Sequence, residues 1–404
     1  MRSKHEKIFG LERNIFFTGL TSFFTDTSTK MIYSVMPLFL KLIGASTMTI
    51  SLIEGIAEST AALVKVVSGY WSDKIRKNKP FMLIGYGLTA LITPLYAYVG
   101  KPVQVLCYRF IERIGKGLRA APRDSLISGS MTQQETGRNF GFHKAMDNSG
   151  AILGPLLAFL LLFLLPGDTK EAIVRNYQII FLVAAIPAVL GVIAIAVFIK
   201  EAKAEKKQDA PQVSFRRLPK RFFFFLAIIF VFTLGNFSDA LLLLKTSETG
   251  ISDVYIPFVY MIFSVVSVLL AIPIGKWSDK IGRARLIIPG FLIFSLTFFM
   301  FGRFNHISIF IGLFVMYGLY SALVDGSQKA MIADLISKDL RGTGYGIYHA
   351  VLGVTLLPAS LIAGWLYDHI SSGVPFYFGS ATALLAAVLM VIFVFTGRKI
   401  NQHN

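Results

Sequence analysis

Long apolar stretches, separated mostly by short polar turns, fill almost the whole chain of 404 residues. They lie at residues 14–42, 49–72, 80–99, 102–129, 137–165, 175–199, 221–245, 252–277, 285–303, 307–335, 342–368 and 374–397. Each is long enough to cross about 30 Å of hydrocarbon as a helix that rises about 1.5 Å per residue. The pattern predicts an all-α membrane protein with twelve transmembrane helices.

One long polar segment, residues 200–220, divides the twelve stretches into two sets of six. It is rich in Lys, Glu and Gln, as a tether between bundles would be. We therefore predict two pseudo-symmetric six-helix bundles, at residues 1–199 and 221–404, joined by a cytoplasmic linker at 200–220. The composition agrees, because 54% hydrophobic residues and only 16% charged ones leave no water-soluble domain to place.

Lysine and arginine collect on one side of the predicted membrane. The amino terminus, the loops after even-numbered spans and the tail hold 25 of them, against 6 in the opposite loops. Cytoplasmic loops carry such an excess, so we expect both termini in the cytoplasm and the protein in a plasma membrane, the inner membrane of a bacterium. The net charge of +17 then reflects topology, and nucleic acid is excluded as a partner because no soluble basic face exists.

Two sequence repeats relate the halves. The segment Gly69-Tyr-Trp-Ser-Asp-Lys-Ile75 recurs 206 positions later as Gly275-Lys-Trp-Ser-Asp-Lys-Ile281. Residues 137–145 of the fifth span match residues 342–350 of the eleventh at an offset of 205. Secondary transporters build alternating access from such paired halves, so the duplication indicates a transporter.

The first repeat resembles the loop that follows the second span in the major facilitator superfamily, Gly-x-x-x-Asp-Arg/Lys-x-Gly-x-Arg/Lys-Arg/Lys. The matching residues are Gly69, Asp73, Lys74 and Lys79 in the first half and Gly275, Asp279, Lys280, Gly282 and Arg283 in the second. The first copy departs at Arg76, where the second has Gly282. The resemblance implies the twelve-helix fold of that family and a cytoplasmic gate formed by these residues.

The fifth span resembles a signature of antiporters in this superfamily. Gly141, Gly150, Gly154 and Pro155 match its first four positions, whereas residues 158–159 are Ala-Phe where the family has two glycines. The resemblance implies a proton-coupled antiporter of the twelve-span drug and metabolite group, and therefore an exporter. The alternative is a generic packing face, because small residues at this spacing let membrane helices approach closely.

The fourth span has the densest charge. Charge at mid-bilayer costs about 2.5–3.5 kcal/mol per side chain, so these residues must face the protein interior or an aqueous cavity. At 100° per residue they share an arc of about 140° on one helix face. They are Arg109, Glu112, Arg113, Lys116, Arg119, Arg123 and Asp124. Residues 113–121 also resemble the fourth-span pattern of the family, which implies a part in proton transfer for Arg113.

Polar residues in other spans complete the candidate site. We expect proton coupling at Asp26, Glu58, Arg113, Asp124 and Asp147, and substrate contacts at Lys30, Arg109, Glu112, Lys116, Asn148, Asn236 and Asp239. Permanent ion pairs are the alternative for the carboxylates. For His143 and His349 we expect packing or hydrogen bonding. The single cysteine, Cys107, should be buried, and it excludes a disulfide.

The excess of Arg and Lys within the spans favours a small anionic or carboxylate-bearing substrate. We expect a monomeric secondary transporter whose partners are this solute, protons and the lipid bilayer, working as a proton-coupled exporter without a cofactor or metal. Proton-coupled import of an organic anion or a metal-chelating metabolite is the alternative. A non-transporting receptor or a membrane enzyme ranks lower, since the loops are too short to hold a catalytic constellation.

Overall fold

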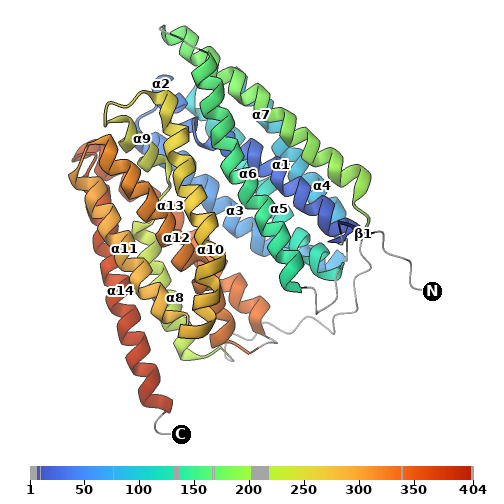
Figure 1. Ribbon diagram of the computed structural model, residues 1–404, viewed down its shortest axis with the longest axis vertical. Helices are drawn as coiled ribbons and strands as arrows, with labels where there is room; N and C mark the ends of the chain where they lie inside the picture. Colours follow the sequence, from blue (N-terminus) through green and yellow to red (C-terminus); the bar gives the residue numbers. More distant parts are fainter. Residues whose placement is uncertain are drawn as a thin grey trace. The chain divides into compact units, whose positions relative to one another are not determined.

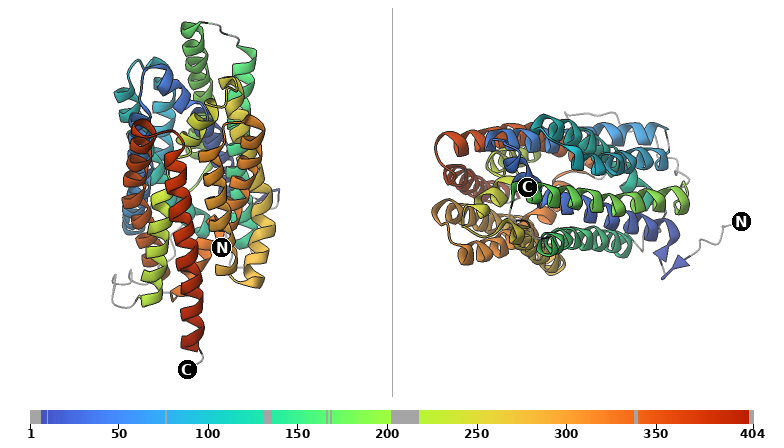
Figure 2. Two further views of the ribbon diagram at one scale, coloured as in Figure 1. Left: turned by 90° about the vertical axis from the view of Figure 1, so that its left-hand side faces the viewer. Right: turned by 90° about the horizontal axis from the view of Figure 1, so that it is seen from above.

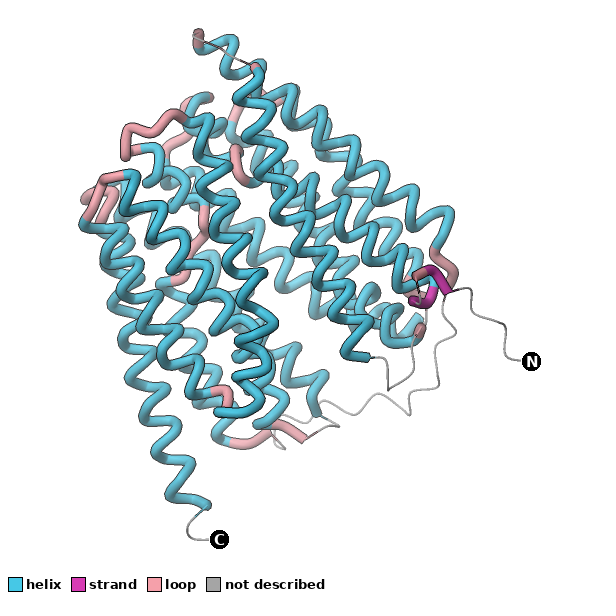
Figure 3. Tube along the Cα trace, in the orientation of Figure 1, coloured by secondary structure: helices cyan, strands magenta, loops and turns pink. Residues whose placement is uncertain are grey.

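The structure, a computed structural model, describes residues 7–9, 11–75, 77–130, 136–165, 167, 169–201, 218–337 and 340–401. This part of the chain is almost entirely helical (Figure 3). A short antiparallel hairpin, β1 (Lys7–Ile8) and β2 (Leu11–Glu12), precedes the first helix. The side chains of Asp73 and Asp279, both predicted gate residues, lie outside the described part.

Every one of the twelve expected spans coincides with helix, so the predicted fold is confirmed. The remaining bounds are α1 (Arg13–Tyr33), α2 (Met36–Leu42), α3 (Thr47–Ile75), α4 (Lys79–Ile92), η1 (Thr93–Tyr98), α5 (Pro102–Gly129), α6 (Thr136–Leu164), α7 (Lys170–Phe198), α8 (Lys220–Gly235), α9 (Ala240–Ser247), η4 (Asp253–Tyr255), α10 (Ile256–Ile281), α11 (Ala284–Arg303), α12 (Ile307–Leu335), α13 (Arg341–His369) and α14 (Val374–Asn401).

The first span of each half is broken, which the apolar pattern did not predict. The first span divides into α1 and α2 at residues 34–35, and the seventh divides into α8 and α9 at residues 236–239. Pro37 stands in the first turn of α2, where its missing N–H is tolerated. Discontinuous helices of this kind often form substrate sites in transporters.

Nine helical segments in the described part of the chain are long and apolar enough to cross a membrane by length and composition alone. The three expected spans that fall short contain α1, α3 and α5. These helices carry ionisable or polar residues in their buried faces, including Ser22, Glu54 and Arg109. The polar character that lowers their hydropathy therefore belongs to the interior of the protein.

The chain forms two compact units. Unit 1 contains the described residues within Met1–Ala45, Thr60–Gln208 and Asp253–Met261. Unit 2 contains those within Ser46–Ser59, Asp209–Ser252 and Ile262–Asn404. The first part of α3 thus belongs to unit 2, and the beginning of α10 belongs to unit 1.

The same helix pairs pack in both units. In unit 1, α1 packs against α6 and α7, while α4 packs against α5 and α7. In unit 2, α8 packs against α13 and α14, and α11 packs against α12 and α14; α14 runs beside α11 and α8 (Figures 1 and 2). These pairs correspond by their order along each half, so the internal repeat extends from sequence to packing.

The end of α7 is tied to α1 and α4. Lys200 N donates to Asn14 Oδ1 at 3.0 Å, and Asn14 Nδ2 donates to Lys200 O at 2.9 Å. Glu201 accepts hydrogen bonds from the N–H groups of Asn78 and Lys79, at 2.8 and 3.0 Å. The Lys79 ammonium in turn donates to the last carbonyls of α7. These bonds satisfy backbone groups that helix ends leave unpaired.

The prediction that Cys107 is buried is wrong, because the residue is exposed. It lies two residues before Arg109 on α5, which places the two side chains about 200° apart around the helix. Arg109 is 1% exposed, so the opposite face of α5 is the one turned outward.

Candidate functional site

Two glycines of α6 allow close contact with α1. A Cβ atom on Gly150 or on Gly154 would lie 2.5 Å from a carbonyl oxygen of α1. No side chain fits at such distances, so glycine is required for this crossing. The contact holds the turns of α1 that carry Asp26 and Lys30 directly against α6. Gly141, the first residue of the predicted antiporter signature, has open space where its Cβ would be.

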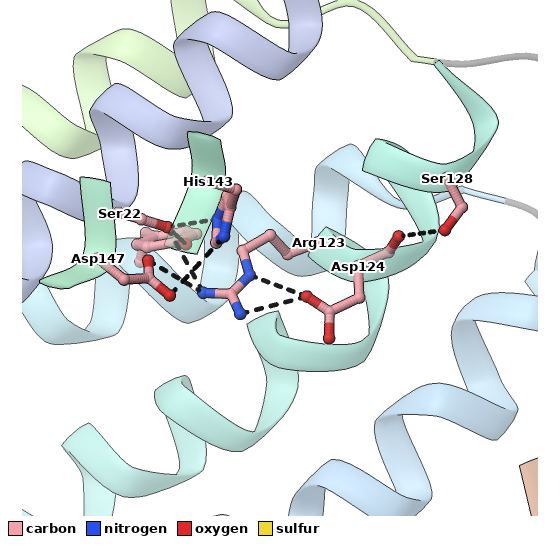
Figure 4. Close-up of polar contacts among 7 residues, drawn as sticks. Ser22, Arg123, Asp124, Ser128, His143 and Asp147 are labelled. Carbon is pink, nitrogen blue, oxygen red and sulfur yellow. Dashed lines mark hydrogen bonds and ion pairs between the residues drawn. The ribbon is translucent and has the colours of Figure 1, made fainter. Parts of the chain in front are cut away.

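Arg123 of α5 lies between carboxylates of α5 and α6 (Figure 4). Its Nε and Nη2 atoms are each 3.2 Å from Asp124 Oδ1. Its Nη1 atom is 3.9 Å from Asp147 Oδ1 and donates to Ser22 Oγ of α1 at 3.4 Å. The guanidinium therefore links α1, α5 and α6, and it joins two predicted coupling residues, Asp124 and Asp147.

One oxygen of Asp147 has no hydrogen-bond partner. Oδ1 is buried, and its distance to Arg123 is too long for a hydrogen bond. The other oxygen, Oδ2, is 3.7 Å from His143 Nδ1. Leaving a buried carboxylate oxygen without a hydrogen bond costs free energy, which marks Asp147 as incompletely paired.

His143 makes the hydrogen bond expected of it, and it also belongs to this charged group. Its ring is 4% exposed, and Nε2 lies 2.9 Å from Ser22 Oγ. The spacing of four residues to Asp147 was the available signal, because such residues share a helix face. We call Ser22, Arg123, Asp124, His143 and Asp147 the Arg123 cluster; Figure 4 shows their side chains converging from three helices.

Asp26 and Arg119 lie at the edge of the Arg123 cluster. Arg119 stacks over the Tyr86 ring, 4.3 Å from its centroid, and donates to Thr89 Oγ1 at 3.1 Å. The half-buried Asp26 feels the charges of Asp147, Arg119 and Arg123. The predicted coupling residues Asp26, Asp124 and Asp147 are therefore electrostatically linked.

Arg109 and Glu112 pair with each other inside unit 1. Arg109 Nη1 is 3.3 Å from Glu112 Oε2, and Tyr96 OH donates to the same oxygen at 2.9 Å. Both charged residues are buried. Of the other predicted residues on α5, Arg113 is buried and Lys116 is exposed.

Lys30 has an aromatic environment. Its Nζ atom lies 5.2 Å from the centroid of the Tyr33 ring and 5.8 Å from that of Tyr260. Arg109 also lies over the Tyr33 ring, at 5.6 Å. Within the described residues Lys30 has no ion-pair partner. It is therefore a cation inside a predicted span that contacts ring faces rather than a carboxylate.

The predicted residues of unit 2 lie at the break between α8 and α9. Asn236 Nδ2 donates to Tyr320 OH at 3.1 Å, and Tyr317 OH donates to Asp239 Oδ1 at 2.8 Å. The two tyrosine rings stack, with centroids 5.4 Å apart. The structure thus brings both residues together with α12 around an aromatic group.

Two further predicted residues lie on α3 and α6. Glu58 lies on the part of α3 that belongs to unit 2. Asn148 follows Asp147 on α6 and is half-buried.

The predicted gate residues differ between the two copies of the repeat. A Cβ on Gly69 would lie 3.3 Å from Ala121 Cβ, whereas Gly275 has open space. In the second copy, Arg283 Nε lies 3.4 Å from Asp334 Oδ2, next to Gly282 at φ +93°. The predicted gate lysines, Lys74 and Lys280, are both exposed.

A duplicated bundle of twelve spans, with charged residues buried between its helices, defines a multi-pass membrane transporter. The chain belongs to the major facilitator superfamily, whose sequence profile matches residues 18–246 and 223–403. It is therefore a secondary transporter and not an enzyme.

Known proteins of this family resemble the chain over most of its length. An uncharacterised MFS-type transporter of Methanocaldococcus jannaschii is 34% identical over 388 residues, which cover 94% of this chain and 95% of that protein. The multidrug resistance protein MdtH of Photorhabdus laumondii is 23% identical over 336 residues, or 82% and 80% of the two chains. The crystal structure of a POT family transporter in complex with a thioalcohol-conjugated peptide superposes with a TM-score of 0.78 at 13% identity, covering 98% of both chains. That structural likeness shows the fold alone.

Proposed function

We propose that the protein is a proton-coupled antiporter that exports a small organic anion across a bacterial cytoplasmic membrane, with both termini in the cytoplasm. The observation that carries the substrate class is Lys30, a cation within a span that has no ion-pair partner among the described residues. A carboxylate bound there would neutralise its charge in a low-dielectric setting, where such an interaction is strong.

The contacts of the other cations within the spans reduce the set of residues that could bind the anion. Arg109 is engaged by Glu112 and Tyr33, which favours a structural part for this pair. Lys116 is exposed and can accompany Lys30 in attracting an anion. Asn236 and Asp239 at the α8–α9 break of unit 2, and Asn148 of α6, are further candidates for substrate contact from the sequence.

Proton coupling is assigned to carboxylates of the first half. Asp147 and Asp124 share Arg123, and Asp26 feels the charges of the same group. A carboxylate that exchanges a proton for a cationic partner provides the alternation that coupling requires. Arg113 and Glu58 are further candidates, Arg113 through the family pattern on the fourth span.

Export is favoured by two observations. The fifth span resembles the antiporter signature of the family at Gly141, Gly150, Gly154 and Pro155. A relative that covers most of the chain is named a multidrug resistance protein. Import of an organic anion or a chelating metabolite is the second candidate, because the same cationic residues serve either direction. The mechanism we propose is alternating access by the two halves of the duplicated fold, with the repeat segments as cytoplasmic gates.

Transport by the purified protein in proteoliposomes tests this function. We expect at least one radiolabelled organic anion in a panel of carboxylates to move faster when a pH gradient is imposed than when the gradient is collapsed. Flux that ignores the gradient would remove proton coupling, and the absence of flux for every anion, with transport of cations instead, would remove the substrate class.

Lys30→Gln is the matching test of the anion site. Because the ammonium is removed while the side chain keeps similar length, we expect the KM for the transported anion to rise about tenfold or more. Lys41→Gln is the control, since Lys41 is exposed at the end of α2. Equal KM values for the two variants would show that Lys30 does not bind the anion.

A further inference from the structure

The internal repeat allows residues of the Arg123 cluster to be compared with the matching positions of the second half. At an offset of 205 residues, Arg123 corresponds to Gln328 and His143 corresponds to Tyr348. These two counterparts also touch, because Tyr348 OH donates to Gln328 Oε1 at 3.0 Å. Both are buried. At these two positions the equivalent helix pair of unit 2 therefore packs with a hydrogen bond between neutral side chains, although Asp124 corresponds to the charged Lys329. Packing of positions 123 and 143 alone thus does not require ionisable side chains.

The partners of His143 indicate which ring nitrogen would carry the hydrogen in a neutral imidazole. Arg123 can only donate hydrogen bonds, so Ser22 Oγ accepts from Arg123 Nη1. The Ser22 hydroxyl hydrogen is then available to His143 Nε2, 2.9 Å away. When Nε2 accepts this bond, the ring carries its hydrogen on Nδ1, which faces Asp147 Oδ2 at 3.7 Å. Tyr86 OH, 3.4 Å from Ser22 Oγ, offers the hydroxyl a second acceptor.

We propose that His143 and Asp147 form one proton-binding pair, and that its protonation decides whether Arg123 pairs with Asp124 or with Asp147. The pair takes one proton from water at His143 Nε2, and the Ser22 hydroxyl turns toward Tyr86. Imidazolium then neutralises Asp147, and Arg123 stays on Asp124, as the 3.2 Å contacts show.

Release of the proton reverses this arrangement. Asp147 regains an uncompensated negative charge whose Oδ1 atom has no hydrogen bond, 3.9 Å from Arg123 Nη1. A shift of the guanidinium by about 1 Å completes that bond and loosens the bond to Asp124. The proposal rests on the proposed proton coupling and adds His143 as its positioning residue.

Several other charged groups influence the protonation of the His143 imidazole. A test must therefore separate their effects from the effect of Asp147. Lys144 is exposed next to His143 on α6, and Asp26 approaches from α1. Because the proposal assigns the proton to one pair, the effect of Asp147 must exceed the effects of these neighbours. The charged or titratable groups around the ring are Asp26 of α1, Tyr86 of α4, Arg123 and Asp124 of α5, and Lys144 and Asp147 of α6.

The test is a pH titration of the full-length protein in lipid nanodiscs, labelled with ¹⁵N-histidine and observed by NMR. The chain has 6 histidines, and His143→Gln assigns the signal of interest by its loss. We expect the His143 signal to titrate in the wild type as the pH is lowered. Asp147→Asn should move that titration to lower pH by about one unit or more, because the carboxylate that stabilises imidazolium is gone.

Lys144→Gln is the matched control, and we expect it to move the titration by less than about half a unit in the opposite direction. Ser22→Ala gives a second test that should alter the balance of Nδ1-H and Nε2-H forms in the ¹⁵N shifts. A titration that is the same in Asp147→Asn as in the wild type, or equal shifts in Asp147→Asn and Lys144→Gln, would overturn the proposal. Size-exclusion profiles and melting curves confirm that the variants are folded.

The titration needs no substrate, so its outcome is separate from that of the transport assay. Linked titration of His143 and Asp147 without gradient-driven flux would contradict the proposed function and leave the proton pair in place. Gradient-driven flux with an unlinked His143 would contradict only the proton pair.

Discussion

Charged residues within the predicted spans occur in two kinds of environment. Arg109 and Glu112 form an ion pair that Tyr96 completes with a hydrogen bond. Asp147 has an oxygen without a hydrogen bond, and Lys30 has only aromatic rings around its ammonium among the described residues. A completed pair stabilises one arrangement, whereas an incomplete one can accept a proton or a solute at little structural cost.

The sequence predicted which residues lie inside and not which of them meet. Helical periodicity placed the charges of the fourth span on one face, because a charge facing lipid is costly. It could not join Arg123 to Asp147 or Ser22, since those contacts cross between helices that are distant in the chain. The contact between His143 and Ser22 could not be predicted for the same reason.

Glu248, just after α9, is an exposed residue whose carboxylate completes a hydrogen-bonded cluster at a helix end. Its carboxylate accepts hydrogen bonds from Ser372 Oγ at 2.6 Å, Tyr367 OH at 2.5 Å and Lys245 Nζ at 3.0 Å. Burial alone would raise the pKa of Glu248, but the hydrogen bonds from Ser372, Tyr367 and Lys245 outweigh it and lower the pKa below its ordinary value. The cluster ties α9 to the turn between α13 and α14.

This lowered pKa predicts how stability depends on pH. A carboxylate whose pKa is lowered by folding stabilises the protein above its unfolded pKa, and that contribution is lost as the pH falls through the folded pKa. Because Glu248 is exposed and solvent screens its charge, we expect Glu248→Gln to reduce the free energy of unfolding by at most about 1 kcal/mol at neutral pH, and by less in acid. Denaturant unfolding at both pH values measures this. Glu171→Gln, an exposed control on α7, should change neither value.

At the scale of elements, the crossing of α1 and α6 depends on backbone contact. Gly154→Ala should force the helices apart, because its Cβ would meet Thr27 O at 2.5 Å and Met31 N at 2.7 Å, both backbone atoms. We expect a loss of about 1–3 kcal/mol in unfolding free energy and slower transport. Gly141→Ala on the same helix is the control, since the space around Gly141 is open. Equal melting temperatures for the two variants would contradict this account.

The spans were predictable and their interruptions were not. Hydropathy is averaged over a whole segment, so it predicts one continuous span even where a few residues are not helical. The α8–α9 break involves only residues 236–239, too few to change the average. Local signals were present, since Gly235 ends α8 and Pro37 stands at the start of α2.

At the scale of the whole molecule, the distribution of Lys and Arg predicts the orientation in the membrane. With Cys107→Ser as background, we expect a cysteine at Lys170 to react with a membrane-impermeant maleimide in intact cells. A cysteine at Lys77 should react only after the membrane is opened. Both positions are exposed, so accessibility from water is the variable measured. The reverse pattern of labelling would place the termini outside.

The breaks in the first span of each half also indicate how the protein evolved. They occur at residues 34–35 and 236–239, and the 205-residue offset of the repeat carries residue 34 to residue 239. A feature shared by both copies is most simply inherited from a single ancestral segment, so a half-length precursor already contained the interrupted helix. Such a precursor would have worked as a symmetric dimer. The replacement of one neutral pair by Arg123 and His143, or the reverse, then dates from after fusion, when one half became free to specialise in handling charge.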